Sequence, residues 1–576
     1  MSGRTVRRRF VEAGRRVVHY RRAGSGPPVV LIHQSPQSSA GLLPLIDRLA
    51  PHCTVFAFDT PGCGDSDPLP RRNPRMADFA DALSETMDMV GLRKAAVFGT
   101  KTGACIGLEL ARRHPARVRG VVLDSLPLFT REEVADMTRV VKSDDGEDAY
   151  YLMPFAPKWD GSHLVSTWSH VRDHIFWFPW YNRKAEARRD IDMPSPEAMH
   201  DGVMDNFRAA DDLRIVVEAA FRYRVHAAVR ELRVPATFTA REDSMLFHCL
   251  DMLPPLRRNQ KIVPLGRDMQ AYRRTIARAV RGYAGGSPPR ETMPRPPARK
   301  ITREFVDRPG ARQILLKRRR TEAPDLVLLH DGPGSSRALE PLLDRLARQH
   351  SVVAPDLPGN GDSTALGHPA PTIDIYADDL AALLAGFRRH RVHLYGQGSG
   401  AAVALSLASR RPDRVASLIL HDLPLFTAAE RRDLRRHLTP PIEPSWDGSH
   451  LYRTWLMLRD SHIYWPWYRR TRDAIRRVDF EASPADLQAR VMEVLKSRRT
   501  YGLTTQAAVR YRPEPDLRRL DAPVLVVAQA GDIAAAAADR VAALARGQVI
   551  EVPRGTAPLA EAIESHLASL RVAQRT

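Results

Sequence analysis

The sequence predicts two tandem α/β domains, each with a mostly parallel, doubly wound sheet and a helical, aromatic-rich cap. Short apolar segments such as PPVVLIH (27–33) and KAAVFGT (94–100) alternate with amphipathic segments such as GACIGLELARRH (103–114). This alternation indicates βαβ units. Strands of a parallel sheet are buried on both faces, which explains why they are apolar almost throughout.

The pattern occurs twice because the chain contains an internal repeat. The offset between copies is 297 residues up to Thr130/Thr427 and 287 from Trp159/Trp446, so the second copy is shorter between these points. A period this long excludes a solenoid and indicates a domain duplication. The repeated words are PLFT (127–130 and 424–427), WDGSHL (159–164 and 446–451) and PWY (179–181 and 466–468).

The join between the copies is rich in proline and glycine. Residues 285–299, GGSPPRETMPRPPAR, lack apolar periodicity and predict a semi-stiff exposed linker. We therefore expect domain 1 at 1–284 and domain 2 at 300–576. The caps are expected at about 131–230 and about 428–515.

Composition places the chain among globular proteins. It is 43% hydrophobic and 27% charged, and it contains no apolar run of transmembrane length. The net charge of +20 comes mainly from arginine. No basic segment coincides with a nucleic-acid motif, so we interpret the charge as a compositional bias rather than a nucleic-acid or membrane surface.

Cysteine usage fits a reducing compartment. The four cysteines all lie in the first half and show no CxxC spacing, while the second half repeats the fold without any. No secretory signal follows the basic N-terminus, so we expect a cytoplasmic protein.

Three motifs recur in the same order in both copies. LIHQSPQSS (31–39) and LLHDGPGSS (328–336) follow the first strand named above and its repeat. They resemble the His-Gly-x-Pro loop of the α/β-hydrolase superfamily. FDTPGCGDSD and PDLPGNGDST resemble its Asp-x-x-Gly-x-Gly-x-Ser turn, and GTKTG and GQGSG its nucleophile elbow. The resemblance covers nearly the whole chain.

Both elbows lack a nucleophile of the kind that the superfamily uses. Its members place Ser, Cys or Asp at the centre, where this chain has Lys101 and Gly398. The acid of the triad matches Asp243 and Asp532. The histidine has no match, since Arg267 and Asp268 stand there in copy 1 and Gly555 and Thr556 in copy 2. The resemblance thus implies that no Ser-His-Asp triad is present.

Lys101 is the strongest candidate for a reactive residue. A lysine in an apolar pocket at a helix N-terminus can lose its proton and act as a base or form a Schiff base. Two alternatives remain open. Lys101 can form a structural ion pair with Asp243 in a site that has no catalytic activity, or it can bind an anionic ligand.

The resemblance also points to the oxyanion side of the site. In the superfamily the residue after the elbow centre, here Thr102 or Ser399, donates its N–H to the oxyanion. A hydroxyl in both copies favours ligand contact or a helix N-cap. Gln34 and Asp331 lie on the facing loop, and His33 and His330 before them are expected to orient it. GQGSGA lacks the third glycine of a dinucleotide loop, so we expect no cofactor and no metal.

Each predicted cap carries a cluster of aromatic residues that includes Trp168 and Trp177 in copy 1. Most are expected to form the cap's own core, and some to line an aromatic pocket. His163 and His450 recur beside Asp160 and Asp447. They are candidates for acid–base groups in place of the missing histidines; alternatively, the DGSH segment caps a helix.

Two functions follow from the residues. The first is a divergent hydrolase or lyase, acting on an ester, epoxide or C–C bond of a small apolar or aromatic molecule, with domain 1 the better candidate for the active copy. The second is a non-catalytic pseudo-hydrolase that binds a ligand or a protein. We expect neither nucleic acid nor membrane as partner and leave a homo-oligomer open.

Overall fold

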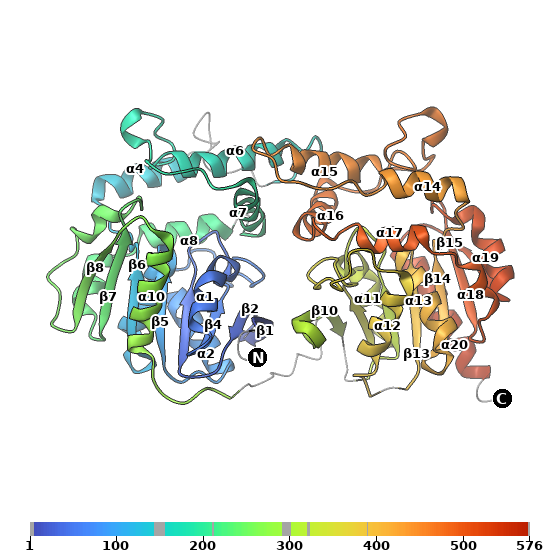
Figure 1. Cartoon of the computed structure of the whole chain (residues 1–576), viewed down its shortest axis with the longest axis horizontal. Helices are drawn as coiled ribbons and strands as arrows, with labels where there is room; N and C mark the ends of the chain where they lie inside the picture. Colours follow the sequence, from blue (N-terminus) through green and yellow to red (C-terminus); the bar gives the residue numbers. More distant parts are fainter. Residues whose placement is uncertain are drawn as a thin grey trace. The chain divides into compact units, whose positions relative to one another are not determined.

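A computed structural model of the chain describes residues 5–142, 156–209, 212–290, 301–319, 323–388 and 390–573 (Figure 1). The chain forms two compact units. Unit 1 comprises Met1–Ala156, Ser162–Arg295 and Pro444–Gly448, and unit 2 comprises Pro157–Gly161, Pro296–Glu443 and Ser449–Thr576. Most of the linker predicted at 285–299 falls in 291–300, outside the described residues.

Unit 1 alternates strands and helices as the apolar pattern predicts. Its elements are β1 (Arg7–Ala13), β2 (Arg16–Ala23), β3 (Pro28–Ile32), α1 (Leu43–Leu49), β4 (Thr54–Phe58), α2 (Met76–Met89), β5 (Ala95–Thr100), α3 (Thr102–Arg113), β6 (Val118–Asp124), α4 (Arg131–Lys142), α6 (Ser162–Phe176), α7 (Pro196–Ala209), α8 (Asp212–Phe221), α9 (Val225–Glu231), β7 (Ala236–Arg241), β8 (Gln260–Leu265) and α10 (Met269–Tyr283).

Unit 2 repeats this order. Its elements are β9 (Thr302–Arg308), β10 (Arg312–Arg319), β11 (Leu326–Leu329), α11 (Glu340–Leu346), β12 (Val352–Pro355), α12 (Ile373–Leu384), β13 (Val392–Gln397), α13 (Ser399–Arg410), β14 (Val415–His421), α14 (Ala428–His437), α15 (Ser449–Asp460), α16 (Pro484–Lys496), α17 (Leu503–Arg510), α18 (Glu514–Arg518), β15 (Val524–Gln529), α19 (Ala538–Ala545), β16 (Gln548–Val552) and α20 (Thr556–Ala573).

Each unit contains one eight-stranded sheet. The strand order is β1-β2-β4-β3-β5-β6-β7-β8 in unit 1 and β9-β10-β12-β11-β13-β14-β15-β16 in unit 2. The first hairpin is antiparallel and pairs antiparallel with the next strand, while all remaining pairs are parallel. The predicted fold class is confirmed.

Successive residues of the central strands pack into two different cores. In β3, Val30 and Ile32 belong to a core with α2 and α3, whereas Val29 and Leu31 belong to a core with α1 and α10. This is the period-two alternation of a strand covered by helices on both faces. Figure 1 shows the same layers, with α1 and α10 on one face of the sheet of unit 1 and α2 on the other.

The cap helices follow the fourth parallel strand of each unit. In unit 1, α4, α6, α7, α8 and α9 all lie between β6 and β7 in the sequence. Trp168 of α6 and Trp455 of α15 are only 1% and 0% exposed, so both serve the packing of their units. Within unit 1, the Trp168 indole N–H donates to the carbonyl oxygen of Trp446 at 3.0 Å.

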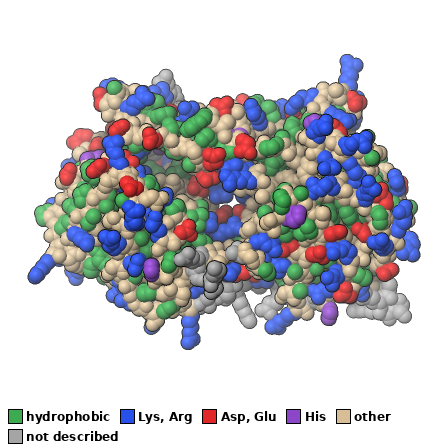
Figure 2. Space-filling model, in the orientation of Figure 1, with side chains coloured by type: hydrophobic (Ala, Val, Ile, Leu, Met, Phe, Trp, Pro, Cys, Tyr) green, Lys and Arg blue, Asp and Glu red, His purple; other side chains and the backbone are tan. Residues whose placement is uncertain are grey.

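Two further predictions concern charge and membrane. Lys and Arg side chains are spread over the visible face of both units in Figure 2 and do not gather on one element. Within the described ranges, no helix is both long and apolar enough to cross a bilayer. Cys53, Cys63, Cys105 and Cys249 are buried thiols.

Candidate functional site

The two elbows have the same unusual backbone. Lys101, between β5 and α3, has φ 50° and ψ −115°, and Gly398, between β13 and α13, has φ 54° and ψ −116°. A residue with a Cβ is strained by about 1–3 kcal/mol in such a region, whereas glycine is not. Unit 1 therefore keeps a strained lysine where unit 2 has the residue that relieves the strain.

The neighbouring glycines are required by close backbone approach. A Cβ on Gly99 would lie 2.2 Å from the carbonyl oxygen of Gly103, and one on Gly103 would lie 2.4 Å from that of His33. The strand, the elbow and the oxyanion-side loop are thus packed backbone against backbone. This is the steric reason for the Gly-x-x-x-Gly pattern.

In unit 1 the elbow opens into a cavity of about 360 Å³. Two residues of the predicted site besides Lys101 border it, namely Gln34 and Asp243. The remaining charged or phenolic lining comes from residues that the sequence analysis did not select: Asp124, Arg189, Arg241, Tyr272 and Arg273.

Lys101 lies in this cavity as a destabilised cation. Burial, helped by the guanidinium groups of Arg189 and Arg241 and opposed by Asp124, lowers the pKa of its amine to about 8. Among the described residues, the Lys101 ammonium forms no ion pair. A substantial fraction of Lys101 is therefore a neutral amine near pH 8.

The predicted alternative of a Lys101–Asp243 ion pair is wrong. The Asp243 carboxylate instead pairs with Arg241 at 2.5 Å, two residues away along the chain. Its second oxygen is buried without a hydrogen-bond partner. The nearer guanidinium takes the place that we had expected for the lysine.

Asp124, the last residue of β6, is the carboxyl group that acts electrostatically on Lys101 from the neighbouring strand. It accepts hydrogen bonds from Thr100 (2.9 Å), Tyr272 (3.0 Å) and Thr239 (3.1 Å). Burial nevertheless raises its pKa above the ordinary range, and the hydrogen bonds only partly offset this. Asp124 can therefore take part in proton transfer beside the amine.

The cap reaches the same region through two residues. Arg189 donates to the carbonyl oxygens of Ile175 (3.2 Å) and Asp243 (3.4 Å). These bonds connect the end of α6 to the acid loop, the loop after β7 that carries Asp243. His174 of α6 has its pKa lowered to about 3 by burial and by Lys101, so its imidazole is neutral. Its Nε2 is buried without a hydrogen-bond partner, and its ring stacks on Trp180.

The oxyanion-side loop is held by hydroxyl groups. The Ser35 N–H donates to the Thr102 hydroxyl at 2.7 Å, and the Gly332 N–H donates to the Ser399 hydroxyl at 2.8 Å. The predicted helix-capping role is wrong, because Thr102 and Ser399 are the first residues of α3 and α13 and the N-cap positions precede them. Neither hydroxyl belongs to the lining of the unit 1 cavity.

The two loop histidines have equivalent, structural hydrogen bonds. His33 donates from Nδ1 to the Gln34 carbonyl at 2.9 Å and accepts the Thr60 N–H at Nε2, also at 2.9 Å. His330 donates to the Asp331 carbonyl at 2.8 Å and accepts the Leu357 N–H at 2.9 Å. Both imidazoles are buried, and burial lowers their pKa values. They orient the loop as expected.

The cap residues chosen from the sequence are not brought to the cavity. His163, Trp168 and Trp177 are absent from its lining. His163 is fully buried in the first turn of α6, with its ring 6.4 Å from that of Phe207. His450 is likewise buried, in the first turn of α15. We correct the expectation that these histidines replace the missing triad member, because cap packing places them elsewhere.

In unit 2 the space in front of the elbow is filled by Asp331. Its Oδ1 accepts the backbone N–H groups of Gly332 and Ser399 at 2.8 Å each and the Ser399 hydroxyl at 3.0 Å. A Cβ on Gly398 would lie only 2.3 Å from the Cγ of Asp331. An internal carboxylate thus occupies the donors that an oxyanion would use.

In unit 2, the carboxylate that matches the triad acid, Asp532, pairs with His421, a histidine on a different strand end from the one expected. Asp532 lies 3.0 Å from Nε2 of His421, the last residue of β14, whose Nδ1 bonds to the Tyr395 hydroxyl at 2.7 Å. His421 stands where unit 1 has Asp124. Burial and Asp532 raise the pKa of the neighbouring Asp422 to about 6. Asp532, His421 and Tyr395 thus form one hydrogen-bonded network in unit 2, whose elbow is filled by Asp331.

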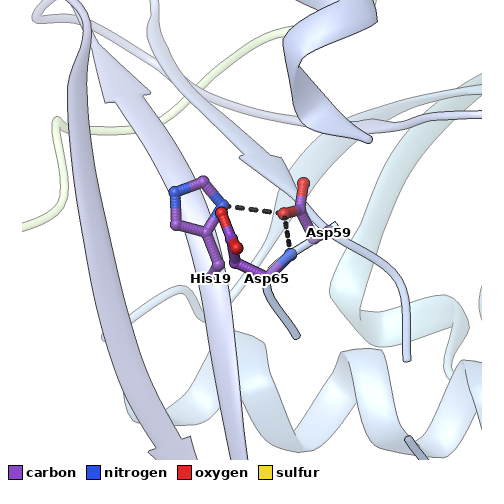
Figure 3. Close-up of side chains that lie close together, drawn as sticks. All are labelled: His19, Asp59 and Asp65. Atoms are coloured by element: carbon purple, nitrogen blue, oxygen red, sulfur yellow. Dashed lines mark hydrogen bonds and ion pairs between the residues drawn. The ribbon is translucent and has the colours of Figure 1, made fainter. Parts of the chain in front are cut away.

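A third cluster joins His19, Asp59 and Asp65 in unit 1, and its atoms are close enough to hold a metal ion (Figure 3). Asp59 already accepts His19 Nδ1–H (2.8 Å), Ser39 N–H (2.7 Å) and Asp65 N–H (3.0 Å). In unit 2 Asp356 accepts the matching Asp362 N–H at 2.9 Å. These bonds identify the aspartate as the anchor of the Asp-x-x-Gly-x-Gly-x-Ser turn.

The comparison with protein families matches both copies. The model for the alpha/beta hydrolase fold covers residues 27–174 and 324–443, which contain the loop, turn and elbow of each copy. The chain belongs to the α/β-hydrolase superfamily.

Curated members of the superfamily match one copy at a time. A haloalkane dehalogenase from Sphingobium indicum is 31% identical over 157 residues, which are 24% of this chain and 51% of that protein. A 2-(acetamidomethylene)succinate hydrolase from Mesorhizobium japonicum is 30% identical over 128 residues, 22% of this chain and 46% of that protein. The chain spans about half the length of the curated relatives it matches.

A solved epoxide hydrolase structure aligns over about twice as much of the chain as these relatives do. A variant of an epoxide hydrolase from Solanum tuberosum has a TM-score of 0.38 and 16% identity, and the match covers 48% of this chain and 98% of that one.

The sequence did carry a signal for two of the missed residues. Asp124 and His421 are the polar ends of the apolar strands VVLD and LILH, beside the elbow strand. A polar residue at the carboxyl end of a buried parallel strand faces the edge where ligands bind in such sheets. Arg189 and Tyr272 gave no such signal, because they lie in a loop and on a helix face.

Proposed function

We propose that unit 1 is a divergent hydrolase or lyase for a small molecule, centred on Lys101, and that unit 2 is catalytically silent. One observation carries the proposal. The elbow of unit 1 presents an amine without an ion-pair partner among the described residues to a cavity of about 360 Å³, whereas the elbow of unit 2 is filled by Asp331.

The chemistry of Lys101 supports an enzyme. An amine whose pKa lies near 8 is a nucleophile and a base at neutral to mildly alkaline pH. Asp124, with its raised pKa, borders the same cavity and can exchange a proton. The strained elbow backbone is retained in unit 1 with a side chain that can react, which is the kind of site where strain serves function.

A second candidate function is binding without turnover. The excess of cationic groups in the cavity favours an anionic ligand, which Lys101 would hold as a charge. The relative named 2-(acetamidomethylene)succinate hydrolase takes, by its name, a succinate derivative. The two functions differ in whether Lys101 is needed for turnover or only for affinity.

A substrate panel separates them. Purified full-length protein is assayed against esters, lactones, epoxides and oxo acids, beside Lys101→Met and Asp331→Asn. We expect turnover that Lys101→Met abolishes and Asp331→Asn preserves. Turnover that survives Lys101→Met would overturn the role of this residue, and thermal stabilisation by anions without any turnover would favour the binding function.

A further inference from the structure

We infer that the unit 1 cavity takes a small carbonyl compound that carries a carboxylate, and that Lys101 forms an imine with its carbonyl carbon. This inference rests on the proposed function, since it names the substrate class and the covalent step of the same site. Three observations carry it: the excess of cationic groups in the lining, a guanidinium that the protein uses incompletely, and the exposure of the Lys101 amine to the cavity.

The lining has more cationic than anionic groups. Lys101, Arg189, Arg241 and Arg273 border the cavity, against the carboxyl groups of Asp124 and Asp243. The Asp124 carboxyl group already accepts hydrogen bonds from Thr100, Tyr272 and Thr239. A carboxylate ligand would balance the remaining charge, and guanidinium groups are suited to bind it in a bidentate manner.

One guanidinium is incompletely used by the protein. Arg189 bonds only to carbonyl oxygens, and its Nε is buried without a hydrogen-bond partner. The Arg189 pKa is lowered by burial and by Arg241, with Asp243 opposing. Burial of an unpaired donor is unfavourable, and a bound carboxylate would supply the missing acceptor.

The elbow presents the amine to the carbonyl group. In this fold the elbow side chain projects over the carboxyl edge of the sheet, so Lys101 approaches a bound molecule from the floor of the cavity. The groups that act on its charge are Arg189 from the cap side, Arg241 from β7 and Asp124 from β6. His174 is neutral, so it adds no positive charge that would have to be overcome.

The proposed step balances without a co-reactant. The Nζ lone pair of Lys101 attacks the carbonyl carbon, a C–N bond forms and the carbonyl oxygen takes a proton. Loss of the second nitrogen proton and departure of that oxygen as water leave the C=N double bond. Asp124 takes up and returns the transferred proton. Addition of water reverses the step and regenerates the amine, with no net oxidation or reduction.

The test traps the imine on the full-length protein. Acetoacetate is incubated with the protein, cyanoborohydride is added, and peptides are mapped by mass spectrometry. We expect the reduced adduct on Lys101 and at least a tenfold lower yield on the exposed Lys261. Acetone, which has the carbonyl group without the carboxylate, should require at least a tenfold higher concentration for the same yield on Lys101.

A matched pair of arginine variants tests the carboxylate contact. Arg241→Gln should raise the half-saturating concentration of acetoacetate at least fivefold more than that of acetone, which reports any change in the Lys101 amine itself because Arg241 also lowers its pKa. The control Arg267→Gln removes an exposed arginine that pairs with Asp190 outside the cavity lining, and should change neither. Equal changes for both probes would contradict carboxylate recognition.

The outcomes separate this inference from the proposed function. Equal labelling of Lys101 and Lys261, or no labelling of Lys101, would overturn the imine. If Lys101→Met still abolished turnover in the substrate panel, the proposed function would stand with Lys101 as a base. Turnover unaffected by Lys101→Met would overturn both. Labelling uses the unmodified protein, so the result does not depend on the folding of a variant.

Discussion

The carboxylate of Asp331 lies 2.8 Å from the backbone nitrogen of Ser399, the first residue of the helix after the unit 2 elbow. That N–H is the one which in this superfamily stabilises an oxyanion. Unit 2 thus carries its own anion at the place where a reacting substrate would develop charge. A side chain at position 398 and the Asp331 carboxylate exclude each other, since the two cannot share the space.

Gly398→Ala should therefore destabilise the protein. The alanine would have to keep the positive φ of Gly398, and its Cβ would lie 2.3 Å from the Cγ of Asp331. Strain and overpacking each cost about 1–3 kcal/mol, so we expect a loss of about 2–6 kcal/mol in the unfolding free energy of unit 2. Denaturant titration measures it.

The double variant Asp331→Gly/Gly398→Ala provides the control. It removes the clash and leaves only the backbone strain, so it should recover at least half of the loss. If Gly398→Ala were neutral by itself, Asp331 would not occupy the elbow.

Arg476 is expected to hold the cap of unit 2 to its acid loop. Its guanidinium donates to the carbonyl oxygens of Ser461 (2.7 Å) and Gly531 (2.5 Å), each one residue before the position that matches the carbonyl bound by Arg189 in unit 1. Arg476→Leu leaves both carbonyls without this donor and should cost about 1–3 kcal/mol. Hydrogen exchange should accelerate in α15 and in the loop after β15.

The neighbouring Arg477 is exposed and offers a matched control. Arg477→Leu should change the unfolding free energy by less than about 0.5 kcal/mol. Equal effects of the two substitutions would show that loss of a positive charge, and not loss of the two Arg476 hydrogen bonds, lowers the unfolding free energy.

The turn anchored by Asp59 should tolerate loss of His19 better than loss of the aspartate. Leu315 takes the place of His19 in unit 2, where its N–H bonds to Ser363 as that of His19 bonds to Ser66. We expect His19→Leu to cost less than about 1.5 kcal/mol. Asp59→Ala removes the acceptor of three donors and should cost about 3–5 kcal/mol. Thermal unfolding compares them, and the reverse order would contradict the structural interpretation.

Much of the fold was accessible from the sequence because it depends on local patterns. The apolar segments at 27–33 and 94–100 became β3 and β5, and the Gly-x-x-x-Gly segments became elbows with the expected backbone. The offset between the copies then gave the position of the matching element in the other copy. Of the predicted site residues, Lys101, Gln34 and Asp243 border one cavity, and their roles there stay predictions.

The rest depended on side-chain directions that a sequence does not contain. Asp331 and Gln34 occupy equivalent loop positions, yet only the structure shows that Asp331 points into the elbow. Whether Asp243 pairs with Lys101 or with Arg241 was a competition between two cations, and the guanidinium two residues away is nearer. His163 was misplaced because a buried cap residue and a pocket residue share the same aromatic surroundings.

The central claim is that Lys101 is an accessible amine with a lowered pKa, and its reactivity tests this directly. Dilute acetic anhydride is applied between pH 6 and pH 11, and acetylation of Lys101 and of the exposed Lys261 is followed by mass spectrometry. Only the neutral amine reacts, so a lowered pKa moves the midpoint to lower pH. We predict a midpoint near pH 8 for Lys101, where burial places its pKa at about 8, and one near the ordinary lysine value of about 10.4 for Lys261. Equal midpoints, or a Lys101 that does not react at any pH, would contradict the account.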